Sequence, residues 1–251
     1  MNTYETFLQK RMEVGSGMMA KVYSYNGYAY KCFNDGYPKE WIDYEYKNQK
    51  EIMKSGLPIP RYYESEFPNS IKMDLINGVS MYEKIANSGI DTVMAEMMIW
   101  FRRIHEVKGL DLKNFSKYIL DKINEAPISN EEKACAKQCY LDVDREISEP
   151  EVLCHMDYHF LNVMYEGNNV QIIDWVNAKN GKAIWDYART YVIYYEHASG
   201  IKTHYLKEVI SYEKYPKEIF MKAVYVSAIH RLTEHDTKRV RQLVKNALIM
   251  K

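Results

Sequence analysis

A polar loop between two short apolar segments constrains the fold of this chain more than any other feature. Residues 151–154 and 170–173 are rich in apolar and β-branched side chains, as buried strands are. Residues 167–169, Gly-Asn-Asn, form a turn signal between them. The polar residues in the loop and directly after the second segment include His155, Asp157, Asn162 and Asp174. The sequence therefore predicts a strand, a polar loop and a second pair of strands that ends on a carboxylate.

These residue types suit phosphoryl transfer from a magnesium nucleotide. A hydroxyl that attacks a γ-phosphate must be oriented and must lose its proton, so a carboxylate such as Asp157 can serve as the base. Mg²⁺ prefers hard oxygen ligands, which the amide of Asn162 and the carboxylate of Asp174 supply. His155 is expected to brace the loop by hydrogen bonding to backbone and to take no part in proton transfer. The alternative is that the His-x-Asp-x-x-x-x-Asn pattern arose by chance.

The cysteines and histidines admit a different reading as a metal site. Four cysteines are few, and we expect them to stay reduced in the cytosol. Cys135 and Cys139 can share a helix face, but no second pair of ligands lies beside them in the sequence. A zinc site of Cys154, His155 and His159 would need a fourth ligand from elsewhere.

The N-terminal segment independently indicates nucleotide binding. Residues 15–17, Gly-Ser-Gly, form a turn before an alternating stretch, and Asn26-Gly27 predicts a type I′ hairpin turn before a strand that carries Lys31. Glycines let the backbone approach phosphates without a Cβ, and Lys31 can reach the α- and β-phosphates. The alternative places Lys31 on the solvent side of an edge strand.

Several motifs, collinear over residues 11–195, resemble the aminoglycoside phosphotransferase and choline kinase superfamily. They are Gly15-x-Gly17-x-x-Ala20, Lys31, Gly56-Leu57-Pro58-Ile59-Pro60, Met73-Asp74-Leu75-Ile76-Asn77-Gly78, Phe101-x-x-Ile104-His105, His155-x-Asp157-x-His159-x-x-Asn162, Ile173-Asp174-Trp175 and Asp186-Tyr187-Ala188-Arg189. The resemblance implies an α+β, two-lobed, protein-kinase-like fold with a small antiparallel β lobe and a larger, mainly helical lobe. We predict that the lobes span residues 1–76 and 77–251.

The resemblance also implies roles for individual residues. Asp157 is the expected catalytic base, and Asn162 and Asp174 are the expected Mg²⁺ ligands. ATP or GTP is expected to bind at Gly15, Ser16, Gly17, Lys31, Glu45, Met73, Asp74 and Leu75, the last three lying in the hinge whose backbone contacts the base. His155 and Asp186 are expected to support the catalytic loop. A plain helix N-cap is the alternative role for Asp186.

Glu45 is the expected partner of Lys31 among several acids. The helix-like stretch 39–55 offers four carboxylates, and it stops at the Gly-Leu-Pro-Ile-Pro turn. Glu45 lies a few turns before that stop, where similar kinases place this residue. The alternative is a solvated charge that pairs with neighbours along the helix.

Departures from the protein kinases favour a small-molecule acceptor. Met156 stands where many protein kinases have an arginine that binds a phosphorylated loop, whereas the superfamily itself commonly has glycine there. Asp174 and Asp186 lie close together in the sequence, and no Ala-Pro-Glu element follows. A peptide-binding activation segment is therefore not expected. We predict a Mg²⁺-dependent kinase that phosphorylates a hydroxyl of a small molecule.

The identity of that acceptor stays open between aminoglycoside, choline or ethanolamine, and sugar. Beyond Thr190, Lys and Arg outnumber Asp and Glu, which does not suit a polycation, although a local acidic patch of Glu196, Glu234 and Asp236 is an option. Trp185, Tyr187, Tyr191, Tyr194 and Tyr195 offer an aromatic cage for a quaternary ammonium. Aromatic residues at helical spacing are more often core.

Composition bears on location and on partners. The net charge is zero and no basic stripe stands out, which argues against nucleic-acid binding. The chain contains no long apolar run, and its start does not read as a signal peptide, so we expect a cytoplasmic protein without a membrane partner. The oligomeric state is not indicated. Segments 91–107, 130–147, 182–197 and 215–249 have helical spacing of apolar residues.

A protein with a kinase shape but no turnover is the alternative from another class. Such a chain would serve as a binding or structural module. The joint presence of Lys31, Asp157, Asn162 and Asp174 argues against it, because loss of activity usually erodes at least one of these positions.

Overall fold

The Asn26-Gly27 turn organises the first sheet of the computed structural model, which describes residues 3–247. The two turn residues have φ values of 49° and 79°, as a type I′ turn requires. The turn joins β2 (Ala20–Tyr25) to β3 (Tyr28–Phe33), with Tyr25 paired to Tyr28. The predicted hairpin is therefore confirmed.

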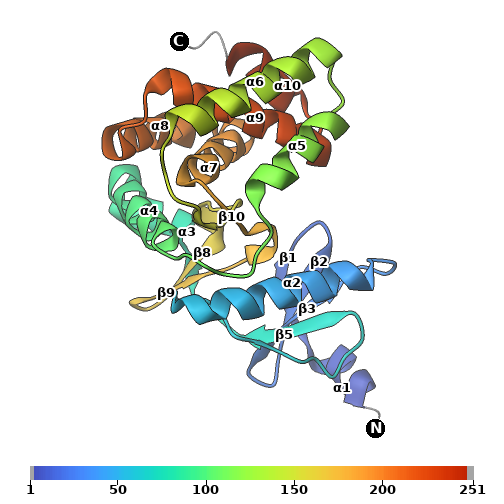
Figure 1. Ribbon diagram of the computed structural model, residues 1–251. Helices are drawn as coiled ribbons and strands as arrows, with labels where there is room; N and C mark the ends of the chain where they lie inside the picture. Colours follow the sequence, from blue (N-terminus) through green and yellow to red (C-terminus); the bar gives the residue numbers. More distant parts are fainter. Residues whose placement is uncertain (1–2, 248–251) are drawn as a thin grey trace. The chain divides into compact units, whose positions relative to one another are not determined.

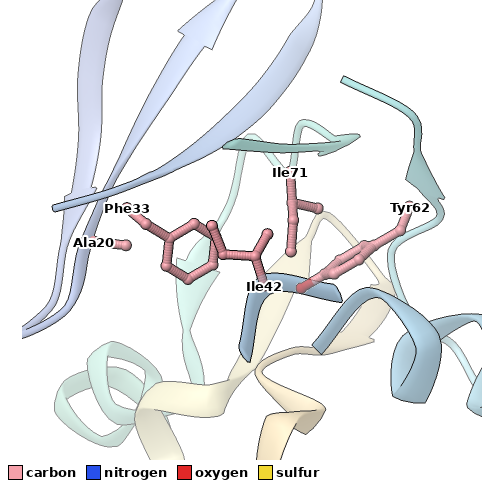
Figure 2. Close-up of a cluster of buried hydrophobic side chains, with 5 residues drawn as sticks. All are labelled: Ala20, Phe33, Ile42, Tyr62 and Ile71. Carbon is pink, nitrogen blue, oxygen red and sulfur yellow. The ribbon is translucent and has the colours of Figure 1, made fainter. Parts of the chain in front are cut away.

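The hairpin belongs to an antiparallel sheet with the strand order β1-β2-β3-β5-β4 (Figure 1). The remaining strands are β1 (Met12–Ser16), β4 (Tyr62–Tyr63) and β5 (Ser70–Asp74). On one face, Ile42 of α2 (Lys39–Ile52) packs in a buried cluster with Ala20, Phe33, Tyr62 and Ile71 (Figure 2). On the other face, Phe7 of α1 (Thr3–Lys10) packs against Tyr30 and Phe67. Strand alternation places Lys31 on the same face as Phe33, toward α2.

The helix predicted over residues 39–55 is α2 followed by a short 3₁₀ turn, Met53–Ser55. Gly56 ends it with a φ of 75°, a left-handed conformation that glycine adopts without steric cost. Glu45, Asn48 and Gln49 are buried on this helix, and Gln49 donates a hydrogen bond of 2.7 Å to the carbonyl of Pro60. A buried polar face on α2 thus lies beside the proline-containing turn.

The described chain divides into two compact units, which comprise residues 3–80 with 162–176 and residues 81–161 with 177–247. We predicted a division after residue 76. The first unit extends to Ser80 because β6 (Val79–Ser80) pairs with β8 (Val163–Glu166), which also pairs with β9 (Asn169–Ile172). The amide of Ile172 donates a hydrogen bond of 2.8 Å to the carbonyl of Pro58. The β8–β9 hairpin is therefore part of the first unit.

Gly78 is the glycine on which this pairing depends. A Cβ at this position would lie 2.0 Å from the carbonyl oxygen of Tyr165 and 2.6 Å from the carbonyl carbon. Both atoms belong to the backbone, which cannot move away without disturbing the strand pairing. We expect Gly78→Ala to lower the free energy of unfolding by about 1–3 kcal/mol, as overpacking does. Urea unfolding measures this.

Gly200 provides the matched control. It lies in α8 (Ser199–Glu213), and nothing surrounds the position of its Cβ within 4 Å. Gly200→Ala should leave the stability unchanged or raise it by up to about 1 kcal/mol. Equal effects of the two substitutions would contradict this account of Gly78.

The second unit is mainly helical (Figure 1). Its other helices are α3 (Met81–Ser88), α4 (Ile90–His105), α5 (Phe115–Glu125), α6 (Asn130–Glu146), α7 (Ala183–His197), α9 (Lys217–Glu234) and α10 (Lys238–Ala247). Helix α9 packs against α5, α6, α7 and α10. Strands β7 (Val152–Cys154) and β10 (Lys179–Gly181) pair antiparallel beside α5 and α7. Among the described helices, none has the length and apolarity needed to cross a membrane.

The predicted helical segments correspond to α4, α6 and α7, but the segment 215–249 is two helices. Helix α9 ends at Glu234, and α10 begins after Thr237, whose hydroxyl accepts a hydrogen bond of 3.2 Å from the amide of Val240. A threonine at that position is a helix N-cap signal. Residues 248 and 249 lie outside the described residues.

Candidate active site

A pocket with a volume of about 510 Å³ lies within the first unit. The residues predicted to bind the nucleotide or the metal all line it: Gly15, Ser16, Gly17, Lys31, Glu45, Met73, Asp74, Leu75, Asn162 and Asp174. Asn162 and Asp174 reach it because the β8–β9 hairpin belongs to this unit, and the amide of Ile173 donates a hydrogen bond of 2.9 Å to the carbonyl of Asn162. The fold thus gathers residues that are far apart in the sequence.

Lys31 and Glu45 form the central ion pair of this pocket. Lys31 Nζ lies 2.7 Å from Glu45 Oε1 and 2.9 Å from Oε2, and Tyr62 donates a hydrogen bond of 3.2 Å to Oε1. The pairing expected from the sequence is present, and the edge-strand alternative is wrong. Burial lowers the pKa of Lys31, but the charges of Asp174 and Glu45 outweigh it and raise the pKa above its ordinary value. Lys31 therefore stays a cation in the pocket.

Asp174 and Asn162 offer oxygen ligands that fit Mg²⁺. Asp174 Oδ1 lies 3.6 Å from Lys31 Nζ and, among the described residues, this buried atom has no hydrogen-bond partner. A buried carboxylate oxygen without a donor has capacity for a cation. A carboxylate and an amide oxygen are the hard donors that Mg²⁺ takes. The residues present therefore fit the predicted metal.

The glycines at the start of the pocket keep space open. Gly17 donates a backbone hydrogen bond of 2.9 Å to Ala20, which closes the turn between β1 and β2. A Cβ on Gly15 would contact Val22 at 3.5 Å, and one on Gly17 would contact the Ala20 carbonyl at 3.6 Å, both at ordinary van der Waals distance. The absent side chains are consistent with close approach of a ligand to this backbone.

The hinge residues also line the pocket, but the side chain of Asp74 is engaged elsewhere. Its carboxylate accepts hydrogen bonds from the amide of Arg61 at 3.0 Å and from the hydroxyl of Tyr63 at 2.9 Å. The side chain of Asp74 is therefore occupied by contacts within the first unit.

In the second unit, Asp186 holds the loop that carries Asp157. This fully buried carboxylate accepts hydrogen bonds from the amides of His155 at 2.7 Å and Met156 at 2.8 Å, and lies 3.1 Å from His105 Nε2. It is not an N-cap, because the cap of α7 is Lys182. The amide of Asp157 donates to His155 Nδ1 at 3.3 Å, so the histidine braces the loop as expected.

Met156 has a backbone conformation that glycine favours. Its φ is 64°, and its side chain is buried. For a residue with a Cβ, the left-handed conformation costs about 1–2 kcal/mol. The methionine therefore holds a left-handed loop conformation at the expense of backbone strain.

The zinc alternative is wrong. His155 Nδ1 accepts from the amide of Asp157, and His159 Nδ1 accepts from the amide of Leu161 at 3.3 Å, so both act as loop braces. Within residues 3–247, the His, Cys, Asp and Glu side chains that converge closely enough for a metal are His105, Cys154 and Asp186. Burial raises the pKa of the Cys154 thiol well above its usual range, and Asp186 already accepts two amide hydrogen bonds. This cluster is a hydrogen-bonded core.

The acidic patch that we considered for a polycationic acceptor is neutralised by arginines. Glu196 accepts a hydrogen bond of 2.7 Å from Arg231, and Asp236 accepts two of 2.6 Å from Arg241. Glu234 pairs with Arg189 and, at 3.1 Å, with Arg231. Each of these three carboxylates is therefore paired with an arginine of the same unit.

The aromatic run on α7 is mostly core. Trp185, Tyr187, Tyr191 and Tyr194 are each at most 4% exposed, and the half-buried Tyr195 has Lys202 Nζ 4.3 Å from its ring centre. Buried rings cannot form an open cage, so the helical spacing reflects packing.

His230 makes the stability of the second unit depend on pH. Its side chain is buried, with Nε2 2.9 Å from the hydroxyl of Tyr118. Burial, aided by the charge of Arg189, lowers the pKa of His230 to about 3. Between pH 6.5 and pH 3, His230 is therefore protonated in the unfolded chain but neutral in the folded chain. The free energy of unfolding consequently falls as the pH falls from 6.5 toward 3. From pH 7 to pH 5, we expect this histidine to cost the wild type about 2 kcal/mol.

Urea unfolding at pH 7 and pH 5 measures this loss. His230→Gln should lose about 2 kcal/mol less than the wild type over this range, because glutamine does not titrate. His204→Gln, at an exposed histidine, is the control and should follow the wild type. The same pH dependence in wild type and His230→Gln would show that His230 is not the group responsible.

The chain is similar to known phosphotransferases in part of its sequence and in its fold. The model of the phosphotransferase enzyme family matches residues 102–207. A search of curated proteins found no match. Among solved structures, aminoglycoside phosphotransferase APH(4)-Ia is similar at a TM-score of 0.67 and 13% identity, over 97% of this chain and 96% of that one.

A choline/ethanolamine kinase family protein and a choline kinase are similar as well. A choline/ethanolamine kinase family protein from Mesorhizobium loti has a TM-score of 0.65 and 12% identity, over 99% of this chain and 89% of that one. Choline kinase LicA from Streptococcus pneumoniae has a TM-score of 0.62 and 16% identity, over 98% and 95%. The predicted resemblance and fold class are confirmed: residues 102–207 carry the pattern of the phosphotransferase enzyme family, and the chain has the kinase-like fold of aminoglycoside phosphotransferases and choline kinases.

Proposed function

We propose that this protein transfers the γ-phosphate of a magnesium-bound nucleoside triphosphate, ATP or GTP, to a hydroxyl of a small molecule. The observation that carries the proposal is the pocket of the first unit, where the Lys31–Glu45 ion pair lies beside Asp174 and Asn162. A fixed cation and hard oxygen ligands in one cavity are what a polyphosphate with its metal needs.

Each residue has a role in this reaction. Lys31, oriented by Glu45, binds phosphate oxygens, and the backbone at residues 15–17 approaches the phosphates. Asp157 orients the acceptor hydroxyl and takes its proton. A bond forms from the acceptor oxygen to the γ-phosphorus, the bond from that phosphorus to the bridging oxygen breaks, and the nucleoside diphosphate leaves.

Asn162 and Asp174 would hold Mg²⁺. The ion, when bound, neutralises charge on the phosphate oxygens. A nucleotide donor is also supported by a similar structure, a thermostable mutant of APH(4)-Ia, which was solved in a ternary complex with ADP and hygromycin B. That structure shares 11% identity with this chain at a TM-score of 0.68, so it supports the proposal through the fold.

Two observations limit how the acceptor is recognised. A polycationic aminoglycoside needs free carboxylates, whereas Glu196, Glu234 and Asp236 are paired with arginines. A quaternary ammonium needs open aromatic faces, whereas the rings of α7 are mostly buried. The paired carboxylates do not support an aminoglycoside, and the buried rings do not support a quaternary ammonium. A sugar is favoured by comparison, because its neutral hydroxyls need neither free carboxylates nor an aromatic cage.

An acceptor panel tests the proposal. Purified protein with Mg²⁺ and ATP or GTP is offered aminoglycosides, choline, ethanolamine, homoserine and sugars, and release of nucleoside diphosphate is measured. We expect release with one class of hydroxyl compound. If no compound causes release of nucleoside diphosphate and magnesium nucleotide does not shift the melting temperature, the alternative of a binding or structural module without turnover would be favoured.

A further inference from the structure

We propose that Arg189 is a positioning residue for Asp157, because its guanidinium anchors the peptide that joins Met156 to the catalytic aspartate. The inference rests on the proposed function, in which Asp157 is the base. All residues involved belong to the second unit, so the geometry is internal to that unit.

Two side chains one turn apart on α7 hold Met156 at both ends. Asp186 accepts the hydrogen bond of its amide at 2.8 Å, and the Nε of Arg189 donates one of 3.3 Å to its carbonyl. That carbonyl belongs to the same peptide group as the amide of Asp157. The peptide planes on both sides of Met156 are thus fixed by one helix.

The backbone at Met156 needs this support. Its φ of 64° is unfavourable for methionine, and released loops relax toward conformations with lower strain. Asp186 holds the amide side of Met156, and the peptide that joins Met156 to Asp157 is held by Arg189 at its carbonyl and by His155 at its amide. His155 belongs to the loop itself, so Arg189 is the contact that ties this peptide to α7.

Arg189 is itself buried and paired. Its side chain is 2% exposed, and its Nη2 pairs with Glu234 of α9, whose side chain is 26% exposed. Burial lowers the pKa of Arg189, but the charges of Glu234 and Asp157 outweigh it and raise the pKa. The guanidinium therefore remains charged. It attracts the carboxylate of Asp157 in addition to holding the backbone beside it.

Arg231 supplies a matched control for a merely structural role. It belongs to the same network between α7 and α9, and donates to Glu196 at 2.7 Å and to Glu234 at 3.1 Å. Its described hydrogen bonds go to these two residues and to His197, not to the loop of Asp157. Removal of either arginine weakens the network, but only removal of Arg189 frees the loop.

The first measurement is hydrogen exchange of the backbone amides in residues 154–159, which needs no acceptor. Arg189→Met should accelerate exchange in this segment, while Arg231→Met should leave it as in the wild type at matched overall stability. The double substitution Arg189→Met with Glu234→Gln removes both charges of the pair, should behave like Arg189→Met and replaces it if that variant does not fold. Equal exchange in the Arg189 and Arg231 variants would overturn the inference.

The second measurement is turnover with the acceptor that the panel identifies. Arg189→Met should lower kcat about 10- to 100-fold, the cost of small misplacements at an active site, with KM for the nucleotide near the wild-type value. Arg231→Met should keep the wild-type kcat. A wild type without turnover would refute the proposed function, whereas an active wild type with equal loss in both variants would refute the role of Arg189 alone.

Discussion

Asp157→Asn is expected to lower kcat by about 100- to 10,000-fold, the contribution of a positioned general base. The amide has nearly the shape of the carboxylate and can still contact the acceptor, but it cannot take the proton. Asp157 is five residues before Asn162 and is not among the residues that line the pocket of the first unit. Nucleotide affinity should therefore be almost unchanged.

Steady-state kinetics and isothermal titration with a non-hydrolysable magnesium nucleotide separate these two effects. The variant should bind as the wild type does and turn over slowly at every nucleotide concentration. A large loss of affinity with an unchanged kcat would assign Asp157 to nucleotide binding and would remove it from the role of base.

Asp174→Ala is expected to weaken binding of the magnesium nucleotide by about 100-fold or more, since changes in the outer shell of a metal site already cost about 10- to 100-fold. Its Oδ1 is a buried oxygen without a hydrogen-bond partner among the described residues, 3.6 Å from Lys31 Nζ. Deletion of this carboxylate removes a ligand for the metal. Titration with and without Mg²⁺ should show that the variant has lost most of the magnesium-dependent part of the affinity.

Asp43→Asn serves as the control for the loss of one negative charge in the same unit. Asp43 lies on α2, is exposed and pairs with Lys39 at 2.7 Å. Its substitution should not change nucleotide affinity. If Asp174→Ala binds the magnesium nucleotide as tightly as Asp43→Asn does, Asp174 is not a ligand.

Features encoded by short stretches of chain were predictable from the sequence. The Asn26-Gly27 turn follows from the two positive φ values that only a few residue types accept, and Gly56 marks the end of the 3₁₀ turn after α2 for the same reason. In both cases the signal lies within a few residues of the structure that it specifies. The Lys31–Glu45 pair is instead expected from the place at which similar kinases carry this glutamate, because the sequence alone left four acids of α2 open.

One missed element had a local signal. Helix α5 begins after Asn114, whose side chain accepts a hydrogen bond of 2.9 Å from the amide of Ser116, and it buries Phe115, Ile119 and Ile123 at helical spacing. An N-cap residue followed by this periodicity predicts a helix. This helix was therefore within reach of the same reasoning that identified α4 and α6.

The contacts of Arg189 had no such signal. A buried arginine at this position is indistinguishable in sequence from a solvated helix charge, and its bond to Met156 exists only because α7 packs beside the loop after β7. The same holds for Glu196 and Glu234, whose partners Arg231 and Arg189 are set by the packing of α7 against α9. Asp236, in contrast, pairs with Arg241 only five residues further along the chain. Net charge along the chain does not reveal which charges pair in space.

Transfer of labelled phosphate tests the central claim most directly. The protein is incubated with Mg²⁺, ATP labelled with ¹⁸O in the γ-phosphate and the acceptor panel, and the products are analysed by mass spectrometry. We predict a phosphomonoester of one acceptor that carries the label, formed by the wild type and nearly abolished in Asp157→Asn. Label that remains in ATP, or that appears only in inorganic phosphate, would contradict the assignment of a small-molecule kinase.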